Sequence, residues 1–314
     1  MTTALPATPH YSATEAAAPE TRSSAWQARL ADYVELTKPK IAMLALVTVS
    51  VGYALALGGR TEWDTLWRAL IGIAFVAAGS SALNQYIERR TDARMERTRN
   101  RPLPAGRLTP AEVLSFGVVS GILGTAYLAF QVNLLTAVLG AATLVLYAFV
   151  YTPLKRYTTF NTAIGAIPGA LPPVLGWTAA GGSLDEGAFA LFAALYLWQF
   201  PHFMAIAWLY RHDYARAGMK MLTIGESASW TSGMLAVGYS LALLPVSLLP
   251  SRCGLAGGGY LLAALVLGSG YIASSCCFLQ TQSEQTARRL LWTSLIYLPA
   301  LLLALVCDHY QLLS

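Results

Sequence analysis

The sequence predicts an all-α polytopic membrane protein, and three observations support this fold class. The 314 residues are 55% hydrophobic and only 12% charged, with a mean hydropathy of +0.50, whereas soluble domains usually carry about 25% charged residues. The charged residues form short clusters between long apolar runs, which are typical of membrane-crossing helices when they exceed roughly 18 residues. The net charge of +5 is gathered in these connecting segments, so we expect no nucleic-acid partner.

Long apolar runs separated by charged clusters predict nine transmembrane helices. The expected spans are 41–58, 68–88, 110–130, 134–152, 161–180, 188–209, 229–249, 255–278 and 290–307. The fifth span contains three prolines and two glycines between Gly165 and Pro173, which predicts a kinked or broken helix. Lipid cannot satisfy the backbone groups that such a break frees, so this segment must face protein or a cavity.

The basic residues give the expected orientation in the membrane. In the nine-span arrangement, 18 of the 21 Lys and Arg residues fall on one side, and the other side keeps only Arg60, Arg68 and Arg252. Because cytoplasmic loops are rich in Lys and Arg, we expect a cytoplasmic N-terminus and an external C-terminus, in a bacterial inner membrane. Residues 1–30, rich in Ala, Thr, Pro and Ser, predict a disordered tail, and residues 31–314 a single domain.

Three polar residues recur every four positions at the end of the second span: Asn84, Glu88 and Asp92, here called the ladder. On a helix they share one face and extend over roughly 12 Å. A solvated helix end with arginine pairs would explain them, but Asn84 lies within the apolar run, where polar groups are costly and usually functional. The arginine-rich segment Arg94–Leu103 follows directly, and carboxylates beside guanidinium groups suit a diphosphate held by Mg²⁺.

Other polar residues are expected on the same side of the membrane. The fourth span ends in Tyr151-Thr152-Pro153-Leu154-Lys155-Arg156, which suits either membrane anchoring or phosphate contact. The sixth span contains Trp198-Gln199-Phe200-Pro201-His202, where His202 could make an interhelical hydrogen bond or bind a ligand. Asp213 follows that span and could simply pair with Arg211 or Arg216.

The ladder resembles the first aspartate-rich motif of the UbiA superfamily of intramembrane prenyltransferases. The longer string Asn84–Leu103 is similar to the protohaem IX farnesyltransferase branch of that superfamily. Further matches are Leu36–Lys40, Tyr151–Arg156, Gly165–Trp177, Trp198–Phe203 and Asp213–Tyr214 with Gly218. The resemblance covers about 36–307, with two departures: Glu88 stands where the superfamily often has Asp, and Asp213 alone represents the second acidic motif.

The resemblance implies a nine-helix bundle around a central apolar chamber, with its active site facing the cytoplasm. It implies transfer of a farnesyl group from farnesyl diphosphate to a vinyl group of haem B, with hydration, giving haem O and diphosphate for terminal oxidase haem biosynthesis. Haem B is then a substrate, Mg²⁺ the cofactor, and a haem A synthase or terminal oxidase assembly protein a partner. The implied Mg²⁺ ligands are Asn84, Glu88 and Asp92, and Asp213 is a further catalytic residue. The implied diphosphate contacts are Arg97, Arg101, Tyr151, Lys155 and Arg156, and the haem contacts Trp198, Gln199 and His202.

Two other functions fit parts of the pattern. A UbiA-type enzyme with a quinone or aromatic acceptor would share the ladder but typically lacks the Trp-Gln-x-Pro-His-Phe run at 198–203. A transporter would share the many spans, the broken helix and a faint similarity between the two halves. Transporters usually place charge near the membrane midplane, whereas here the charges gather at one edge.

Overall fold

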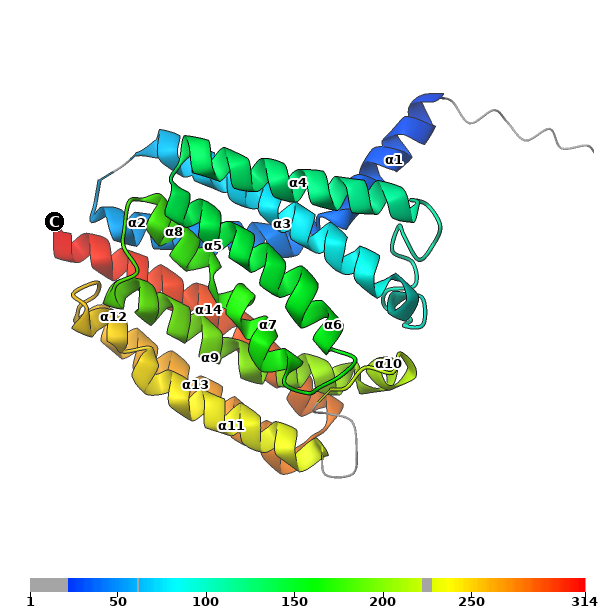
Figure 1. The fold of residues 1–314 in the computed structure, drawn as a ribbon. Coiled ribbons are helices and arrows are strands. Elements are labelled where there is room, and N and C mark those ends of the chain that lie inside the picture. The colour runs from blue at the N-terminus through cyan, green and yellow to red at the C-terminus, as the bar shows by residue number, and fades with distance from the viewer. Residues whose placement is uncertain (1–21, 61, 222–227, 314) are drawn as a thin grey trace, which may run out of the picture.

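The computed structural model describes residues 22–60, 62–221 and 228–313, and every regular element in these ranges is a helix (Figure 1). The N-terminal half contains α1 (Arg22–Leu36), α2 (Pro39–Leu57), α3 (Trp63–Asp92), α4 (Pro110–Gln131), α5 (Leu134–Val145), the π-helical segment η1 (Leu146–Tyr151), α6 (Thr152–Leu154), α7 (Asn161–Ala170) and α8 (Pro172–Ala179). The C-terminal half contains α9 (Glu186–Leu209), α10 (Arg211–Arg216), α11 (Ala228–Val246), α12 (Leu249–Arg252), α13 (Gly258–Thr281) and α14 (Glu284–Leu313).

Eight helices in the described ranges are long and apolar enough to cross a membrane. They are Pro39–Leu57, Trp63–Asp92, Pro110–Gln131, Leu134–Leu154, Glu186–Leu209, Trp230–Arg252, Gly258–Thr281 and Glu284–Leu312. The expected fifth span is not among them, because the chain there forms two short helices, α7 and α8, that break at Leu171. The break precedes Pro172 and Pro173, which supply no backbone N–H to continue the hydrogen bonding of α7, so the predicted interruption is confirmed.

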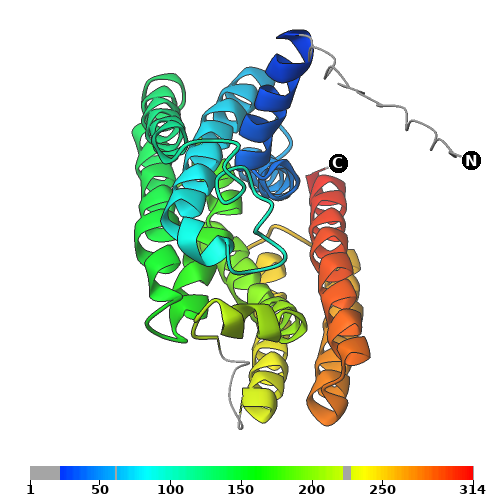
Figure 2. The same ribbon diagram turned by 90° about the vertical axis from the view of Figure 1, so that its right-hand side faces the viewer.

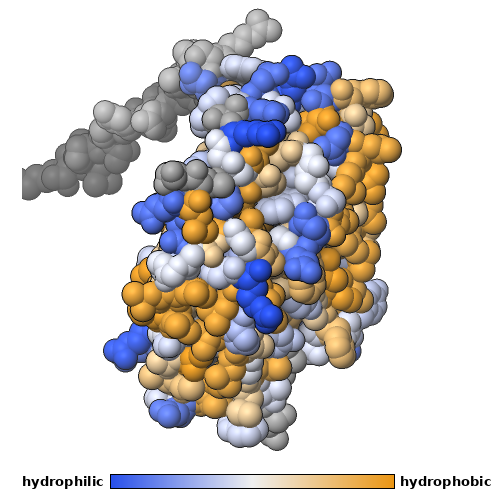
Figure 3. All heavy atoms as spheres, turned by 90° about the vertical axis from the view of Figure 1, so that its left-hand side faces the viewer, coloured by the Kyte–Doolittle hydropathy of each residue, from blue (hydrophilic) through white to orange (hydrophobic). Residues whose placement is uncertain are grey.

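Large apolar side chains cover the sides of the bundle. Ile122 on α4, Val266 on α13 and Leu303 on α14 are each more than 60% exposed. In Figure 3, broad hydrophobic areas flank the paler and more hydrophilic residues of the end that faces the viewer. Surfaces of this kind suit lipid rather than water, and with the eight apolar helices they make the chain an integral membrane protein.

Glycines allow two pairs of helices to approach closely. A Cβ added to Gly79 of α3 would lie 2.7 Å from the backbone nitrogen of Gly121 on α4, and one added to Gly176 of α8 would collide with the carbonyl of Val49 on α2. Small residues at helix interfaces are a common packing device in membranes, since they bring backbones into contact. The second contact holds the short helix α8 against α2, and so fixes one half of the broken segment.

The connections divide between the two ends of the bundle. The α3–α4, α6–α7 and α13–α14 connections, together with α10, lie at one end, here called the ladder end because α3 finishes there with Asp92 (Figure 1). Figure 2 looks onto this end, where the connection between α3 and α4 crosses the face. The C-terminal end of α14 lies at the opposite end of the bundle. The connections rich in Lys and Arg therefore gather at one end, as the sequence predicts.

The expected disordered tail of residues 1–30 needs correction at its end. Residues 1–21 lie outside the described residues, but the chain is helical from Arg22, in α1. This helix is anchored on α4: the Tyr33 and Phe116 ring centroids are 5.5 Å apart, and Arg29 pairs with Glu112. The apolar residues Trp26, Leu30 and Val34 recur every four positions, which is a helical spacing. The Ala- and Ser-rich composition of the region made this spacing easy to overlook.

Candidate functional site

The ladder forms one buried face at the end of α3. Asn84, Glu88 and Asp92 are at most 5% exposed, and Asp92 is the last residue of the helix. The Asn84 amide Nδ2 donates a hydrogen bond of 3.0 Å to Glu88 Oε2. The structure thus brings all three predicted Mg²⁺ ligands onto one face, as the four-residue spacing requires.

Each ladder residue contacts a cation from a different segment. Lys38 Nζ donates to Asn84 Oδ1 at 2.9 Å, and Lys155 Nζ donates to Glu88 Oε1 at 2.8 Å. Arg101 Nη1 donates to Asp92 Oδ2 at 2.7 Å. Two buried carboxylates would be costly alone, so these three cations stabilise their charge.

Lys38 is a site residue to which the sequence analysis assigns no role. It joins α1 to α2 with φ 49°, one of two non-glycine residues with positive φ in the described ranges. Lysine rarely adopts this left-handed conformation, and such strain often marks functional positions. Burial lowers the pKa of the Lys38 amine below its ordinary value, and nearby Arg101 and Lys155 also lower it. The signal in the sequence is the Lys38-Pro39 pair at a helix start, where proline at the first position is favoured.

Lys155 follows the π-helical segment and α6. Its Nζ lies 4.5 Å from the centroid of the Tyr151 ring, which in turn packs against Gly165 of α7. Burial alone would lower the pKa of Lys155, but Glu88 and Tyr151 outweigh burial and raise it above its ordinary value. Lys155 is therefore a firmly charged group beside the ladder, and Tyr151 helps to hold it there.

The three arginines expected to contact phosphate have different partners in the structure. Arg156 is exposed and donates from Nη2 to Thr91 Oγ1 at 2.9 Å, so it contacts the end of α3 but no ladder oxygen. The Arg97 guanidinium lies 5.0 Å from the Tyr210 ring centroid at the end of α9. Arg101 alone among the predicted arginines reaches a ladder carboxylate in the described residues.

Three connections touch one another at the ladder end. Met95 of the α3–α4 connection packs with Ala217 and Met219, which follow α10. The Lys220 backbone N–H donates to the Lys155 carbonyl at 2.8 Å. These three linked connections, here called the cover, lie at the ladder end, and Arg97 and Arg156 are exposed on them.

Asp213 belongs to this cover but not to the ladder. It lies in α10 and pairs with Arg216, whose Nη2 is also 3.9 Å from Glu96 Oε2. Among the described residues, no three His, Cys, Asp or Glu side chains come together as a metal-binding group. The geometry places Asp213 at the same end as Asp92, in an ion pair of its own.

The three predicted haem contacts on α9 point in two directions. His202 Nδ1 lies 2.8 Å from Ser294 Oγ on α14, and Trp198 Nε1 donates to the Ser294 carbonyl at 2.9 Å. The Trp198 and His202 rings stack, with centroids 5.0 Å apart. Gln199 instead donates from Nε2 to the Ala166 carbonyl of α7 at 3.1 Å. Trp198 and His202 therefore form one unit against α14, while Gln199 fastens α9 to the broken segment.

The Ser294 hydroxyl determines the tautomer of His202. Its Oγ donates to the Leu291 carbonyl at 2.6 Å, so it accepts the hydrogen bond from His202 Nδ1–H. Neutral imidazole then keeps its lone pair on Nε2. The same arrangement orients histidines that bind metal ions through Nε2.

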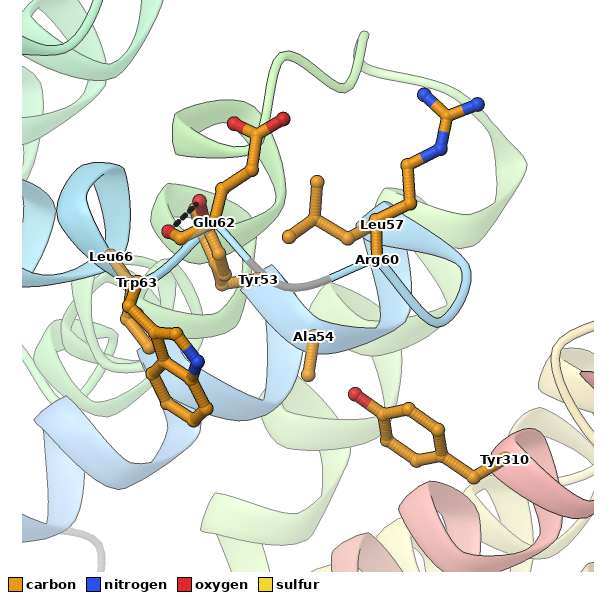
Figure 4. Close-up of a pocket in the computed structure, with 8 residues that line it drawn as sticks. All are labelled: Tyr53, Ala54, Leu57, Arg60, Glu62, Trp63, Leu66 and Tyr310. Carbon is orange, nitrogen blue, oxygen red and sulfur yellow. Dashed lines mark hydrogen bonds between the residues drawn. The ribbon is translucent and has the colours of Figure 1, made fainter.

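A small pocket lies at the other end of the bundle and is separate from the ladder. Figure 4 shows Tyr53 and Ala54 of α2 in it, with the hydroxyl of Tyr310 from α14 directed toward Ala54, while the Arg60 side chain points away from Tyr310. Tyr53 donates to the Glu62 carbonyl at 2.8 Å. Since Lys38 precedes the first residue of α2, the length of this 19-residue helix, about 28 Å, separates the pocket from the ladder.

The ladder residues fit a magnesium ion. Asp92 Oδ1 is buried and has no hydrogen-bond partner among the described residues, while the other oxygens contact only movable cationic side chains and the Asn84 amide. Magnesium prefers carboxylate and amide oxygens and is usually bound by one or two carboxylates together with substrate phosphates. An orphaned carboxylate oxygen beside a second carboxylate matches that preference.

Comparison with known proteins places the chain in a family. The UbiA prenyltransferase family matches residues 45–299. The chain is 44% identical over 287 residues to a protoheme IX farnesyltransferase of Solibacter usitatus, covering 88% of this chain and 98% of that one. It is 41% identical to the protoheme IX farnesyltransferase of Myxococcus xanthus, with 88% and 94% covered.

Solved structures show the same fold. A digeranylgeranylglyceryl phosphate synthase superposes with a TM-score of 0.73 at 21% identity, covering 90% of this chain and 99% of that one. A UbiA homolog from Archaeoglobus fulgidus, bound to GPP and Mg²⁺, superposes with a TM-score of 0.55 at 17% identity and the same coverage. The chain therefore belongs to the UbiA prenyltransferase family, on its protoheme IX farnesyltransferase branch.

Proposed function

We propose that the protein transfers a farnesyl group from farnesyl diphosphate to a vinyl group of haem B, with hydration, giving haem O and diphosphate. The relatives that share 41–44% of its residues over most of both lengths carry the name of this activity. The observation that carries the proposal is the ladder, in which two carboxylates and an amide each contact a separate cation. The oxygens of this group suit a metal ion, and the cations beside them suit a diphosphate.

Asn84, Glu88 and Asp92 would hold Mg²⁺, and the cations would turn toward the phosphate oxygens. A UbiA homolog from Archaeoglobus fulgidus has been solved bound to GPP and Mg²⁺, which supports a magnesium ion and a prenyl diphosphate as ligands here. When bound, Mg²⁺ would stabilise the negative charge that develops on the departing diphosphate. Lys155 and Arg101 would then exchange their carboxylate partners for phosphate oxygens, and Lys38 would exchange the Asn84 amide oxygen for one.

The basic residues of the cover complete the diphosphate site. Arg97 and Arg156 would approach from the connections at the ladder end, and Tyr151 would keep Lys155 in place. Asp213 would contribute a carboxylate from the second half of the chain. It would also hold Arg216 at the ladder end. Positive groups gathered at this end would lower the barrier because the leaving-group charge grows as the C–O bond breaks.

The acceptor is haem B, which would lie toward α9 and α14. His202 would bind or orient the haem iron through Nε2, with Trp198 stacked beside it and Gln199 keeping α9 against α7. The diphosphate leaves with the electron pair of the C–O bond, and the vinyl π electrons form the new C–C bond to the farnesyl carbon. Water then adds to the resulting cation and loses a proton, which gives the hydroxyl group. An apolar central chamber within the bundle would delay this addition until the C–C bond has formed.

The membrane arrangement completes the proposal. The short helices α7 and α8 together would make a ninth crossing, broken at Leu171 where it faces protein. The ladder end, which carries most of the Lys and Arg residues, would face the cytoplasm of a bacterial inner membrane, with the N-terminus on that side. Haem O is strongly apolar, so it would pass to a membrane-bound haem A synthase or terminal oxidase assembly protein.

One assay tests the proposed function. Detergent-purified protein is incubated with haem B, farnesyl diphosphate and Mg²⁺, and the product is identified by mass. We expect haem B to gain a farnesyl group and one water, and we expect excess chelator to abolish the product. Prenylation of 4-hydroxybenzoate in place of haem B would instead identify an aromatic acceptor and overturn the proposal.

A further inference from the structure

The amide of Asn84 lies between groups that accept hydrogen bonds and a group that only donates. Nδ2 lies 3.0 Å from Glu88 Oε2 and 2.9 Å from Thr152 Oγ1. Oδ1 lies 2.9 Å from Lys38 Nζ, which has no lone pair when charged. The amide nitrogen therefore faces Glu88 and Thr152, and the amide oxygen faces the opposite way, toward Lys38.

Thr152 enforces this orientation because its hydroxyl proton is already donated to another group. Thr152 is 2% exposed, and its Oγ1 donates to the Tyr147 carbonyl at 2.7 Å. The hydroxyl can then only accept from Asn84, so an amide oxygen turned toward it would face two lone pairs and the Glu88 carboxylate. The chain of bonds runs in one direction, from Asn84 to Thr152 to the Tyr147 carbonyl.

The π-helical segment explains why threonine occupies this place. η1 ends at Tyr151, and the Thr152 backbone N–H also donates to the Tyr147 carbonyl, five residues earlier. The wider turn changes which side chains face α3 after it, and π-helical turns inside α-helices are frequent at functional sites. Pro153 follows Thr152 and has no backbone N–H, so it cannot donate the next hydrogen bond of a regular helix.

We propose that Thr152 is a positioning residue that holds the Asn84 carbonyl oxygen on the side that Lys38 occupies, where Mg²⁺ would take the place of the ammonium group. This inference rests on the proposed function, in which Asn84, Glu88 and Asp92 hold Mg²⁺. Thr152 touches neither the metal nor the diphosphate, and acts through Asn84. Groups that orient metal ligands in this way typically change metal affinity or activity by about 10- to 100-fold when they are removed.

The test compares Thr152→Val with Thr152→Ser in the full-length purified protein. Valine keeps the shape but removes the hydroxyl, whereas serine keeps it. Mn²⁺ binding in the presence of inorganic diphosphate is measured by electron paramagnetic resonance, beside haem O formation and thermal unfolding. Thr143→Val is the matched control, because Thr143 also donates to its own helix, to the Leu139 carbonyl at 2.7 Å.

We expect Thr152→Val to weaken Mn²⁺ binding about 10- to 100-fold, with Thr152→Ser and Thr143→Val close to the parent protein. Unchanged Mn²⁺ affinity in Thr152→Val, or an equal loss in Thr152→Ser, would overturn the positioning role. Failure of the parent protein to make haem O would overturn the proposed function instead, so the two failures are distinguishable.

A second variant keeps the test decisive if Thr152→Val does not fold. Thr152→Ala also removes the hydroxyl, and its smaller side chain cannot crowd the π-helical turn. We expect it to weaken Mn²⁺ binding about 10- to 100-fold, as for Thr152→Val. Mn²⁺ affinity equal to that of the parent protein in folded Thr152→Ala would overturn the proposal.

Discussion

Lys155 and Glu88 form an ion pair of 2.8 Å between Nζ and Oε1, although 67 residues separate them in the chain. The pair is mostly buried, with side-chain exposures of 13% and 7%. Lys155 thus occupies an oxygen that Mg²⁺ would need in the proposed site, and it is also a group that a diphosphate would attract. Metal and diphosphate should therefore help each other to bind, because the diphosphate draws Lys155 away from Glu88.

Replacing Lys155 should affect the two ligands in opposite directions. Lys155→Gln keeps a hydrogen-bond donor for Glu88 but removes the competing charge. We expect Mn²⁺ alone to bind roughly tenfold more tightly, which corresponds to about 1.4 kcal/mol of competition removed, and inorganic diphosphate to bind more weakly. Isothermal titration calorimetry with each ligand separately measures both changes.

Lys220→Gln is the matched control for this experiment. Lys220 lies at the same end of the bundle with an exposed side chain, and only its backbone contacts Lys155. Lys220→Gln removes the same charge as Lys155→Gln but leaves the ladder unchanged, so the affinities for Mn²⁺ and diphosphate should stay near those of the parent protein. If Lys155→Gln weakened Mn²⁺ binding, the competition argument would be wrong.

Asp92 has a buried oxygen, Oδ1, with no hydrogen-bond partner among the described residues, so we expect its charge to be essential for holding Mg²⁺. Asp92→Asn keeps the shape and the fold but removes the charge that Mg²⁺ requires. We expect haem O formation to fall by roughly 10²- to 10³-fold, as for loss of one preorganised electrostatic group, while the yield of folded protein is retained. Product mass spectrometry and size-exclusion chromatography check the two parts.

The other end of the same helix supplies a control for Asp92→Asn. Asp64 is in the first turn of α3, and its side chain is 79% exposed beside Arg68. Asp64→Asn makes the same chemical change far from the ladder, and we expect normal haem O formation. Near-normal activity of Asp92→Asn would remove Asp92 from the site.

Two variants of Lys38 should lose diphosphate affinity equally but differ in stability. Its φ of 49° costs roughly 1–2 kcal/mol for a residue with a side chain, and nothing comparable for glycine. Lys38→Gly and Lys38→Ala both remove the ammonium group, so we expect similar losses of diphosphate affinity. The glycine variant should nevertheless be more stable than the alanine variant by about 1 kcal/mol, seen as a higher melting temperature in detergent.

The comparison between these two Lys38 variants contains its own control. Both lack the same contact with Asn84, so any difference in melting temperature reports the backbone at this position. Equal melting temperatures would contradict the strain argument, and full diphosphate affinity in either variant would exclude Lys38 from the site.

Local patterns made the ladder predictable from the sequence. The four-residue spacing of Asn84, Glu88 and Asp92 needs only a helix to align the three side chains, and α3 extends without a break to Asp92. The interruption of the fifth span was predictable for the same reason, since Pro172 and Pro173 act on their own segment.

The partners of the ladder were not predictable in this way. Lys38 reaches Asn84 only because the chain turns at a strained residue, and Thr152 reaches it only after a π-helical turn that no simple periodicity indicates. The direction of each side chain on α9 also depends on tertiary packing: Gln199 and His202 are three residues apart, but one contacts α7 and the other α14. The spacing of these residues in the sequence predicts that they lie on one helix, but it does not predict which helices they contact.

His202 and Ser294 allow a test of the haem assignment. In the proposed function His202 binds or orients haem iron through Nε2, and Ser294 fixes the tautomer that exposes that lone pair. We expect His202→Ala to change the Soret absorption of bound haem B and weaken its binding. Ser294→Ala keeps the imidazole but releases Nδ1, so we expect a smaller loss, within about 10- to 100-fold.

His212→Ala is the control, because His212 is an exposed histidine of α10 at the ladder end. Its removal should leave the Soret band and haem affinity unchanged, which separates binding at His202 from general haem adsorption to histidine. A Soret spectrum in His202→Ala identical to that of the parent protein would show that this imidazole does not contact the iron. In that event the hydrogen bond to Ser294 only joins α9 to α14, and the haem must be held by other groups of the bundle.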